Sequence, residues 1–214
     1  MAKKTEPKKG DPKRHVVDTA LALAAERGWR SLTLGEIAET AGMTLAELHA
    51  VVDSKPGILM ALADMVDGAM LAAGPSDGDT PRERLFEVLM RRFEALQPYK
   101  DGLASVLRDA PGDPVAALCG GLHLLRSMVW TLEAAGIGSA GLLGMMRTKA
   151  LAAIYLTTMP VWLRDEGADL GRTMAALDRR LARAESLATL CGGRRRRRRG
   201  GDEPAADEAE ASPA

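Results

Sequence analysis

The chain has 214 residues, of which 46% are hydrophobic, and it carries 29 basic and 29 acidic side chains. This length is sufficient for one sizeable hydrophobic core or two smaller ones. Because no uninterrupted apolar run reaches roughly 18 residues and the chain does not open with a signal-peptide pattern, we expect a cytoplasmic protein without a membrane span.

The N-terminal end is strongly basic although the whole chain is neutral. Residues 1–14 contain six basic and two acidic side chains. We expect residues 1–12 to form a disordered basic arm ahead of the first helix. Such an arm can reach the minor groove or the phosphate backbone of DNA, and the alternative is a solubilising end without a specific role.

Residues 13–72 have the pattern of a small helical DNA-binding domain. An amphipathic helix begins near His15 and ends at Gly28. Two short helices follow within Leu32–His49, joined by an Ala-Gly-Met turn, which is the pattern of a helix-turn-helix. Thr44 and Glu47 have the spacing of a capping box for the second of these helices.

This order of helices and the motifs Leu-Thr-x-x-x-Ile-Ala, Ala-Gly-x-Thr and Ser-Lys resemble the N-terminal domain of TetR/AcrR-type transcriptional regulators over roughly residues 14–72. The resemblance implies an all-α, TetR-like fold, with a three-helix helix-turn-helix head and a C-terminal helical bundle. It also implies a homodimer that binds double-stranded DNA. The positions that match the DNA contacts of the family are Thr33, Thr44, Leu45, His49 and Lys55.

The expected recognition helix is poor in groups that read bases. Thr44, Leu45, Ala46 and Glu47 offer few donors and acceptors to base edges. Residues 15–60 contain three basic side chains against six acidic ones, a composition that binds phosphates weakly. A second interpretation, in which the fold is kept and DNA recognition is lost, therefore stays open.

A polar loop at 73–81 separates the head from a bundle over 81–190, for which we expect helices at roughly 81–96, 97–109, 113–135, 139–167 and 169–190. Together with the head this gives about nine helices. In the last one, Leu170, Met174, Leu177 and Leu181 form an apolar stripe. The stripe is either intramolecular core or, as the TetR resemblance implies, part of a dimer interface built from the last two long helices.

Residues 82–182 also resemble, by scattered matches such as Arg147–Thr158 and Trp162–Asp165, the lipid-binding accessory proteins of ubiquinone biosynthesis, which share the TetR-like fold. This resemblance implies a lipid, such as an isoprenoid, in the bundle. The bundle is rich in Met and Leu, which adapt to irregular apolar ligands, although an ordinary filled core has the same composition. The candidate ligand-binding residues are Met128, Trp130, Met146, Tyr155, Met159 and Trp162.

Several other features predict no function of their own. We expect residues 191–214, with the run Arg194–Arg199 and acidic residues after it, to be a disordered tail that binds nucleic acid weakly or has no specific role. Gly136–Gly141 fits the dinucleotide fingerprint, but a helical pattern precedes it where a strand is needed, so no cofactor is expected. The cysteines and histidines lack metal-ligand spacing, and no catalytic constellation is visible.

The sequence thus predicts a non-enzymatic, TetR-like regulator that is controlled by a small apolar ligand. The alternative prediction is a lipid-binding accessory protein of the same fold.

Overall fold

The computed structural model describes residues 11–109 and 114–199. Over these residues the regular structure is entirely helical, which confirms the all-α prediction. The α-helices are α1 (Pro12–Arg27), α2 (Leu34–Thr40), α3 (Leu45–Val51), α4 (Lys55–Ala72), α5 (Pro81–Leu96), α6 (Lys100–Asp109), α7 (Pro114–Ala134), α8 (Gly141–Leu163) and α9 (Gly171–Arg199). No helix in this part of the chain is long and apolar enough to cross a membrane.

The three helices of the head are defined by local capping chemistry. Thr44 caps α3 and forms the predicted capping box with Glu47. Thr33 and Glu36 form the same box at the start of α2. Gly42 has a φ of 66° in the turn between α2 and α3, a left-handed conformation in which a side chain would be strained.

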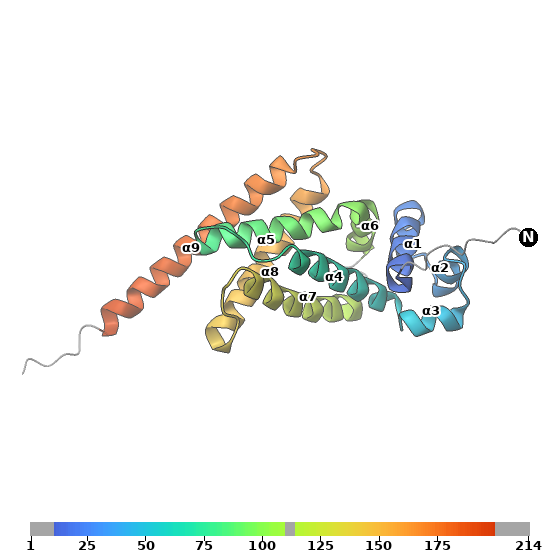
Figure 1. Ribbon diagram of the computed structural model, residues 1–214, viewed down its shortest axis with the longest axis horizontal. Helices are drawn as coiled ribbons and strands as arrows, with labels where there is room; N and C mark the ends of the chain where they lie inside the picture. The colour runs from blue at the N-terminus through green and yellow to red at the C-terminus, as the bar shows by residue number, and fades with distance from the viewer. Residues whose placement is uncertain (1–10, 110–113, 200–214) are drawn as a thin grey trace, which may run out of the picture.

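The helix α4 joins the head to the bundle (Figure 1). Its first residues pack in the head, and its second half packs against α5 and α7. The bundle core is centred on Phe93, whose ring stacks on Tyr155 with centroids 5.0 Å apart and lies 5.9 Å from the ring of Trp162. Head and bundle therefore share a continuous helix.

The last helix settles the alternatives for its apolar stripe. Leu170, Leu177 and Leu181 are buried, and α9 packs against α8 and α5, so the stripe belongs to the intramolecular core. The helix runs to Arg199 rather than ending near residue 190 as expected. Figure 1 shows it extending past the rest of the bundle on the side away from the head. Of the disordered arm expected at 1–12, Pro12 belongs to α1, and of the disordered tail expected at 191–214, residues 191–199 belong to α9, so the prediction of disorder was wrong at these positions. Residues 1–10 and 200–214 lie outside the described residues.

The expected helix at 97–109 is interrupted at its start. Gln97–Tyr99 form a 3₁₀ turn, and α6 begins at Lys100. Pro98 lacks the N–H that a continuous α-helix would need, which accounts for the break. The change of direction places α6 across α1.

Candidate functional site

The exposed side of α3 carries three of the residues that match DNA contacts. Leu45 is 60% exposed, and Thr44 and His49 are exposed as well. Leu48 points into the core of the head and is buried. The hydroxyl of Thr44 is already engaged, because it donates to the Glu47 carboxylate at 2.9 Å and accepts from the Glu47 amide at 3.2 Å. Thr44 therefore serves first as the cap of α3.

Lys55 is bound within the head. Its Nζ donates to the carbonyl oxygens of Trp29 and Leu32, both at 2.7 Å, and lies 4.9 Å from the centroid of the Trp29 ring. The ammonium group therefore holds the loop between α1 and α2 against the start of α4. Sequence reasoning missed this role, because no local pattern connects residues so far apart in the chain.

The surface charge of the head is unevenly arranged. Glu36 is exposed, and hydrogen bonds from the amide and hydroxyl of Thr33 hold its pKa below the ordinary value, so it stays ionised. Lys13 and Arg14 are exposed on the first turn of α1. Arg27 and Arg30 are also exposed, at the end of α1 and in the loop that follows it, and Arg27 lies 4.0 Å from Glu36.

The head and the bundle are joined through α1 and α6. Gly102 of α6 lies directly on the backbone of α1, since a Cβ at this position would be 2.3 Å from the carbonyl oxygen of Leu21. Hydrogen bonds surround this crossing: Trp29 N to Ser105 Oγ at 2.9 Å, Arg30 N to Asp109 Oδ2 at 2.8 Å, and Tyr99 OH to Asp18 Oδ1 at 2.7 Å. These contacts hold α6 against α1 and the loop that follows it.

A cavity of about 390 Å³ lies between α4, α5, α6, α7 and α8. Its size falls within the usual range of small-molecule sites. Its wall is mostly apolar, with polar side chains from α5, α7 and α8. The lining residues are Pro56, Leu59, Met60, Leu62, Ala63, Val66, Arg92, Leu96, Leu103, Val106, Leu107, Gly120, Gly121, His123, Leu124, Ser127, Tyr155, Leu156 and Met159.

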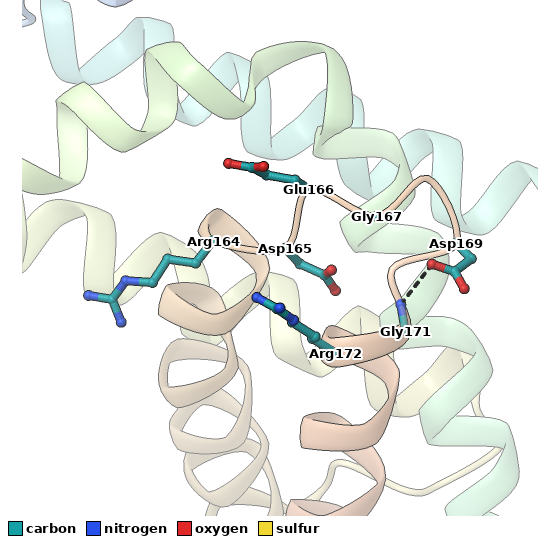
Figure 2. A pocket seen from close by; sticks show the side chains of 7 residues that line it. All are labelled: Arg164, Asp165, Glu166, Gly167, Asp169, Gly171 and Arg172. Carbon is teal, nitrogen blue, oxygen red and sulfur yellow. Dashed lines mark hydrogen bonds between the residues drawn. The ribbon is translucent and has the colours of Figure 1, made fainter.

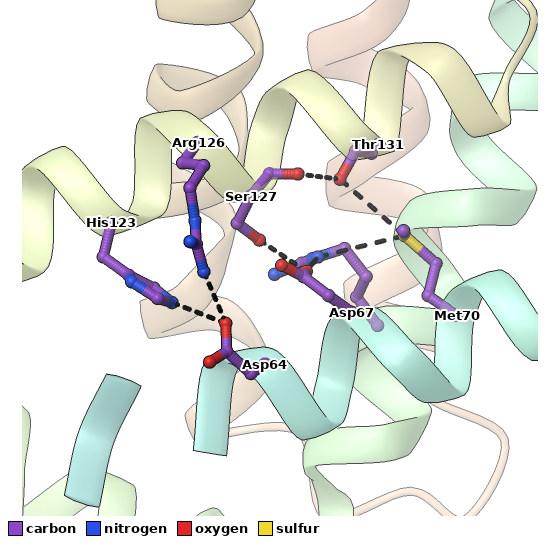
Figure 3. A network of polar contacts seen from close by, with 8 residues as sticks. Asp64, Asp67, Met70, His123, Arg126, Ser127 and Thr131 are labelled. Atoms are coloured by element: carbon purple, nitrogen blue, oxygen red, sulfur yellow. Dashed lines mark hydrogen bonds and ion pairs between the residues drawn. The ribbon is translucent and has the colours of Figure 1, made fainter. Parts of the chain in front are cut away.

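A buried polar network adjoins this cavity. Asp67 pairs with the Arg92 guanidinium and accepts a hydrogen bond from Ser127 Oγ at 2.5 Å. Figure 3 shows the contact between Ser127 and Asp67, with Thr131 placed between Ser127 and Met70. The network joins α4 to α7 and to α5 of the bundle.

A second contact between α4 and α7 lies nearer the surface. Asp64 accepts from Arg126 Nη2 at 2.7 Å, and His123 Nε2 lies 3.2 Å from the same carboxylate oxygen (Figure 3). Burial raises the pKa of the nearby Tyr155 hydroxyl, and the charge of Arg92 opposes that rise. Tyr155 is therefore neutral at physiological pH.

Of the six residues predicted to bind a ligand, only some lie at the cavity. Tyr155 and Met159 line the cavity. Met128 and Trp162 are fully buried in the core but do not line it.

The other two predicted residues do not lie at this cavity. Trp130 is 51% exposed and Met146 is 60% exposed, because their positions on α7 and α8 face away from the bundle core. Conversely, Arg92 and Ser127 were missed, since polar residues on amphipathic helices usually mark the solvated face. Only the packing of five helices shows that these two side chains turn inward.

Large exposed apolar side chains gather on α7 and α8. Seven of the eleven found in the described residues belong to these two helices. They are Leu122, Trp130, Leu142, Leu143, Met145, Met146 and Leu156. An apolar surface of this kind often marks a protein–protein contact.

A hollow of about 530 Å³ lies at the corner between α8 and α9 (Figure 2). Its lining is mostly charged, and Arg164 and Glu166 extend outward while Asp169 turns back to the amide of Gly171 at 3.3 Å. The buried carboxylate of Asp165 accepts from the amide and hydroxyl of Thr173, so it fixes the corner. We assign this hollow a structural role. No group of three potential metal ligands occurs among the described side chains.

Solved structures of TetR transcriptional regulators share this architecture. One from Nitrosomonas europaea ATCC 19718 has a TM-score of 0.67 at 26% identity, over 82% of this chain and 99% of that chain. One from Rhodococcus sp. RHA1 has a TM-score of 0.57 at 19% identity, over 80% and 93% of the two chains. One from Streptomyces coelicolor has a TM-score of 0.57 at 18% identity, over 94% of each chain. The chain therefore has a TetR-like fold.

A second similarity is confined to the end of the bundle. Residues 147–188 match the family model of COQ9. This segment includes most of α8 and the first part of α9, and it overlaps the region that resembles lipid-binding accessory proteins. No curated protein matches the chain significantly.

Proposed function

We propose that the protein is a DNA-binding transcriptional regulator controlled by a small, mainly apolar ligand in the bundle cavity. The observation that carries the proposal is the similarity to the Nitrosomonas europaea regulator, which extends over 99% of that chain and so includes both head and bundle. In this proposal α3 enters the major groove and presents Thr44, Leu45 and His49. Thr33 lies at the cap of α2, beside the same groove. The proposal assigns no catalytic role.

Control by a ligand requires a path from the cavity to the head. Two walls of the cavity, α4 and α6, are also in contact with the head. A ligand that binds one arrangement of α6 better than another would shift the position of α1 through the crossing at Gly102. Such differential binding is the thermodynamic requirement for coupling between two sites.

A second copy of the chain is the proposed partner. The TetR resemblance implies a homodimer, in which two heads read two half-sites of one operator. Because the stripe of α9 is buried, we place the interface on the exposed apolar surface of α7 and α8. The interface expected from the TetR resemblance used the last two long helices, and α8 is common to both placements.

The DNA-binding proposal is tested by fluorescence anisotropy with the full chain. The labelled DNA is the region upstream of the protein's own gene, and a scrambled sequence of equal composition is the control. A preference for the native DNA at near-physiological salt supports the proposal. Equal binding that salt removes would contradict control of its own promoter, since non-specific phosphate contacts behave in this way.

The second candidate function is a lipid-binding accessory protein that kept the fold and lost DNA recognition. The COQ9 match at residues 147–188 and the apolar exposed side of α3 favour it. It predicts a co-purifying isoprenoid or phospholipid, which native mass spectrometry would detect as an added mass. A ligand-free protein that takes up no lipid from vesicles would argue against it.

A further inference from the structure

Two buried side-chain nitrogens of cavity-lining residues, Arg92 Nε and His123 Nε2, make no hydrogen bond in the described part of the chain. His123 Nε2 lies 3.2 Å from the carboxylate of Asp64, whereas Arg92 Nε has no such neighbour in the described residues. Arg92 is only 2% exposed, and one of its Nη atoms is paired with Asp67. Its guanidinium lies 5.3 Å from the centroid of the Tyr155 ring. The Nε of Arg92, however, has no hydrogen-bond partner in the described part of the chain. Buried N–H groups are nearly always paired in folded proteins, so this one needs an explanation.

The cavity supplies the explanation. Arg92 lines it, beside Ser127 and Tyr155, whereas Asp67 is not part of the wall. The rest of the wall is mostly apolar. A molecule that fills this space would therefore meet mostly apolar side chains, together with the polar residues Arg92, His123, Ser127 and Tyr155.

The charges around Arg92 select among possible ligands. The positive guanidinium is balanced by Asp67, which is 7% exposed. A ligand carboxylate would bring a second negative charge into this buried site, and a cation would face the guanidinium. Both are unfavourable away from water. A neutral acceptor oxygen adds no charge and satisfies the unused donor.

We propose that the cavity binds a neutral, mainly apolar molecule that carries one carbonyl or hydroxyl oxygen, and that this oxygen accepts a hydrogen bond from Arg92 Nε. Asp67 positions the guanidinium for this contact. The proposal deepens the proposed function by naming the class of its ligand. It is tested without DNA, so a failure of ligand recognition and a failure of DNA binding give different results.

The reporter for the test is phenylnaphthylamine, a neutral fluorescent dye without an oxygen atom. The full chain is loaded with the dye at pH 8. The dye is then displaced with decanone, decanol, decanoate or decylammonium, four compounds with the same number of carbon atoms. Decanone and decanol should displace the dye at concentrations at least about tenfold lower than the charged pair, as expected when a charged donor pairs with the oxygen. Decanoate or decylammonium acting as well as decanone would overturn the proposal. The proposal would also be overturned if the protein bound no dye and decanone left its thermal unfolding midpoint unchanged.

A double variant isolates the contact itself. Asp67→Leu with Arg92→Met removes the whole ion pair, because replacing a buried pair by apolar residues is tolerated better than breaking it. The variant should bind the dye as before and lose affinity for decanone by about tenfold. The matched control, Asp178→Leu with Arg82→Met, removes an exposed pair of 2.6 Å outside the cavity and should change neither value. Unchanged decanone affinity in the folded Asp67/Arg92 variant would overturn the role of Arg92. If that variant does not fold, the displacement series with the native chain tests the preference for a neutral ligand.

Discussion

The ammonium group of Lys55 connects the start of α4 with the loop between α1 and α2. Lys55 lies at the first position of α4, and its hydrogen bonds to two carbonyl oxygens close the loop that follows α1. The TetR resemblance implies a DNA contact for this residue, and an ammonium group would contact phosphate. The contacts within the head give it a structural role that exists without DNA.

Lys55→Met should therefore lower the free energy of unfolding by about 3 kcal/mol or more, because it removes two hydrogen bonds to a charged group and each is worth roughly 1.5–3 kcal/mol. Urea denaturation followed by circular dichroism measures this change. Lys149→Met, at an exposed position of α8, is the control and should be neutral. Full stability of Lys55→Met combined with a loss of DNA affinity would restore the phosphate contact as the main role.

The exposed Leu45 predicts which chemical group of DNA the start of α3 contacts. An exposed leucine at the start of a recognition helix can contact the methyl group of thymine but cannot donate a hydrogen bond. Replacing a contacted thymine by uracil should weaken binding to the operator about fourfold, from about 0.8 kcal/mol for each buried CH₂ group. The effect should vanish in Leu45→Ala and persist in Leu187→Ala, which changes an exposed leucine of α9. Equal sensitivity to uracil in Leu45→Ala would exclude this contact.

At the scale of helices, local chemistry determines where most elements begin. Thr44 with Glu47 is a signal within four residues, and the structure confirms this cap. Thr80 caps α5 in the same way, directly before Pro81. The cavity has no such signal, because its wall comes from five helices that are separated in the chain. The inward direction of Arg92 depends on how α5 packs, which its own sequence does not determine. This is why Tyr155 and Met159 were found while Arg92 was missed.

The crossing of α1 and α6 depends on Gly102. Gly102→Ala should lower the free energy of unfolding by about 1–3 kcal/mol, because the added methyl meets the carbonyl oxygen of Leu21. Gly68→Ala is a matched control in α4, where nothing lies within 4 Å of the added Cβ. It should be neutral or stabilising by up to about 1 kcal/mol, from helix propensity. Thermal unfolding of both variants tests the crossing, and equal effects would show that α6 does not rest on α1 as described.

The corner between α8 and α9 should show a defined dependence on pH. Burial opposes ionisation of Asp165, but hydrogen bonds from Thr173 and Gly167 and the charge of Lys100 outweigh it, so its pKa lies below the ordinary 3.8. The carboxylate therefore stabilises the folded state above pH 3.8, and this contribution is lost as the pH falls through the lower pKa of the folded state.

Asp165→Asn should accordingly be less stable than the native chain by about 1–2 kcal/mol at neutral pH. The difference should narrow as the pH falls through the folded-state pKa, because Asp165 then becomes neutral as well. Thermal midpoints measured across the acid range check this. Asp169→Asn, whose exposed carboxylate only meets the amide of Gly171, is the control. A difference that stays constant with pH would contradict the assignment.

At the scale of the whole molecule, the fold places the helix-turn-helix head and the cavity on one connected set of helices. The proposed dimer interface lies on exposed apolar side chains of α7 and α8, one of which, Leu156, also borders the cavity. Two copies joined there would fix the distance between their heads. Movement of α6 and α1 would change that distance, and with it the fit to two half-sites.

Met146→Lys should disrupt this dimer. The substitution places a charge on the apolar surface of α8, where Met146 is 60% exposed. Light scattering after size-exclusion chromatography should show a dimer for the native chain and a monomer for the variant. Leu187→Lys, at an equally exposed position of α9, should remain a dimer. A monomeric native chain would contradict the interface.

The most direct test of the account is an in vitro selection with the full chain, fragmented genomic DNA and near-physiological salt. A sequence-reading dimer predicts enrichment of an inverted repeat, with half-sites separated by one or more turns of the double helix. The enriched DNA should bind far more tightly than a scrambled copy. A folded, dimeric protein that enriches no sequence would contradict DNA recognition, and the lipid-binding alternative would then replace it.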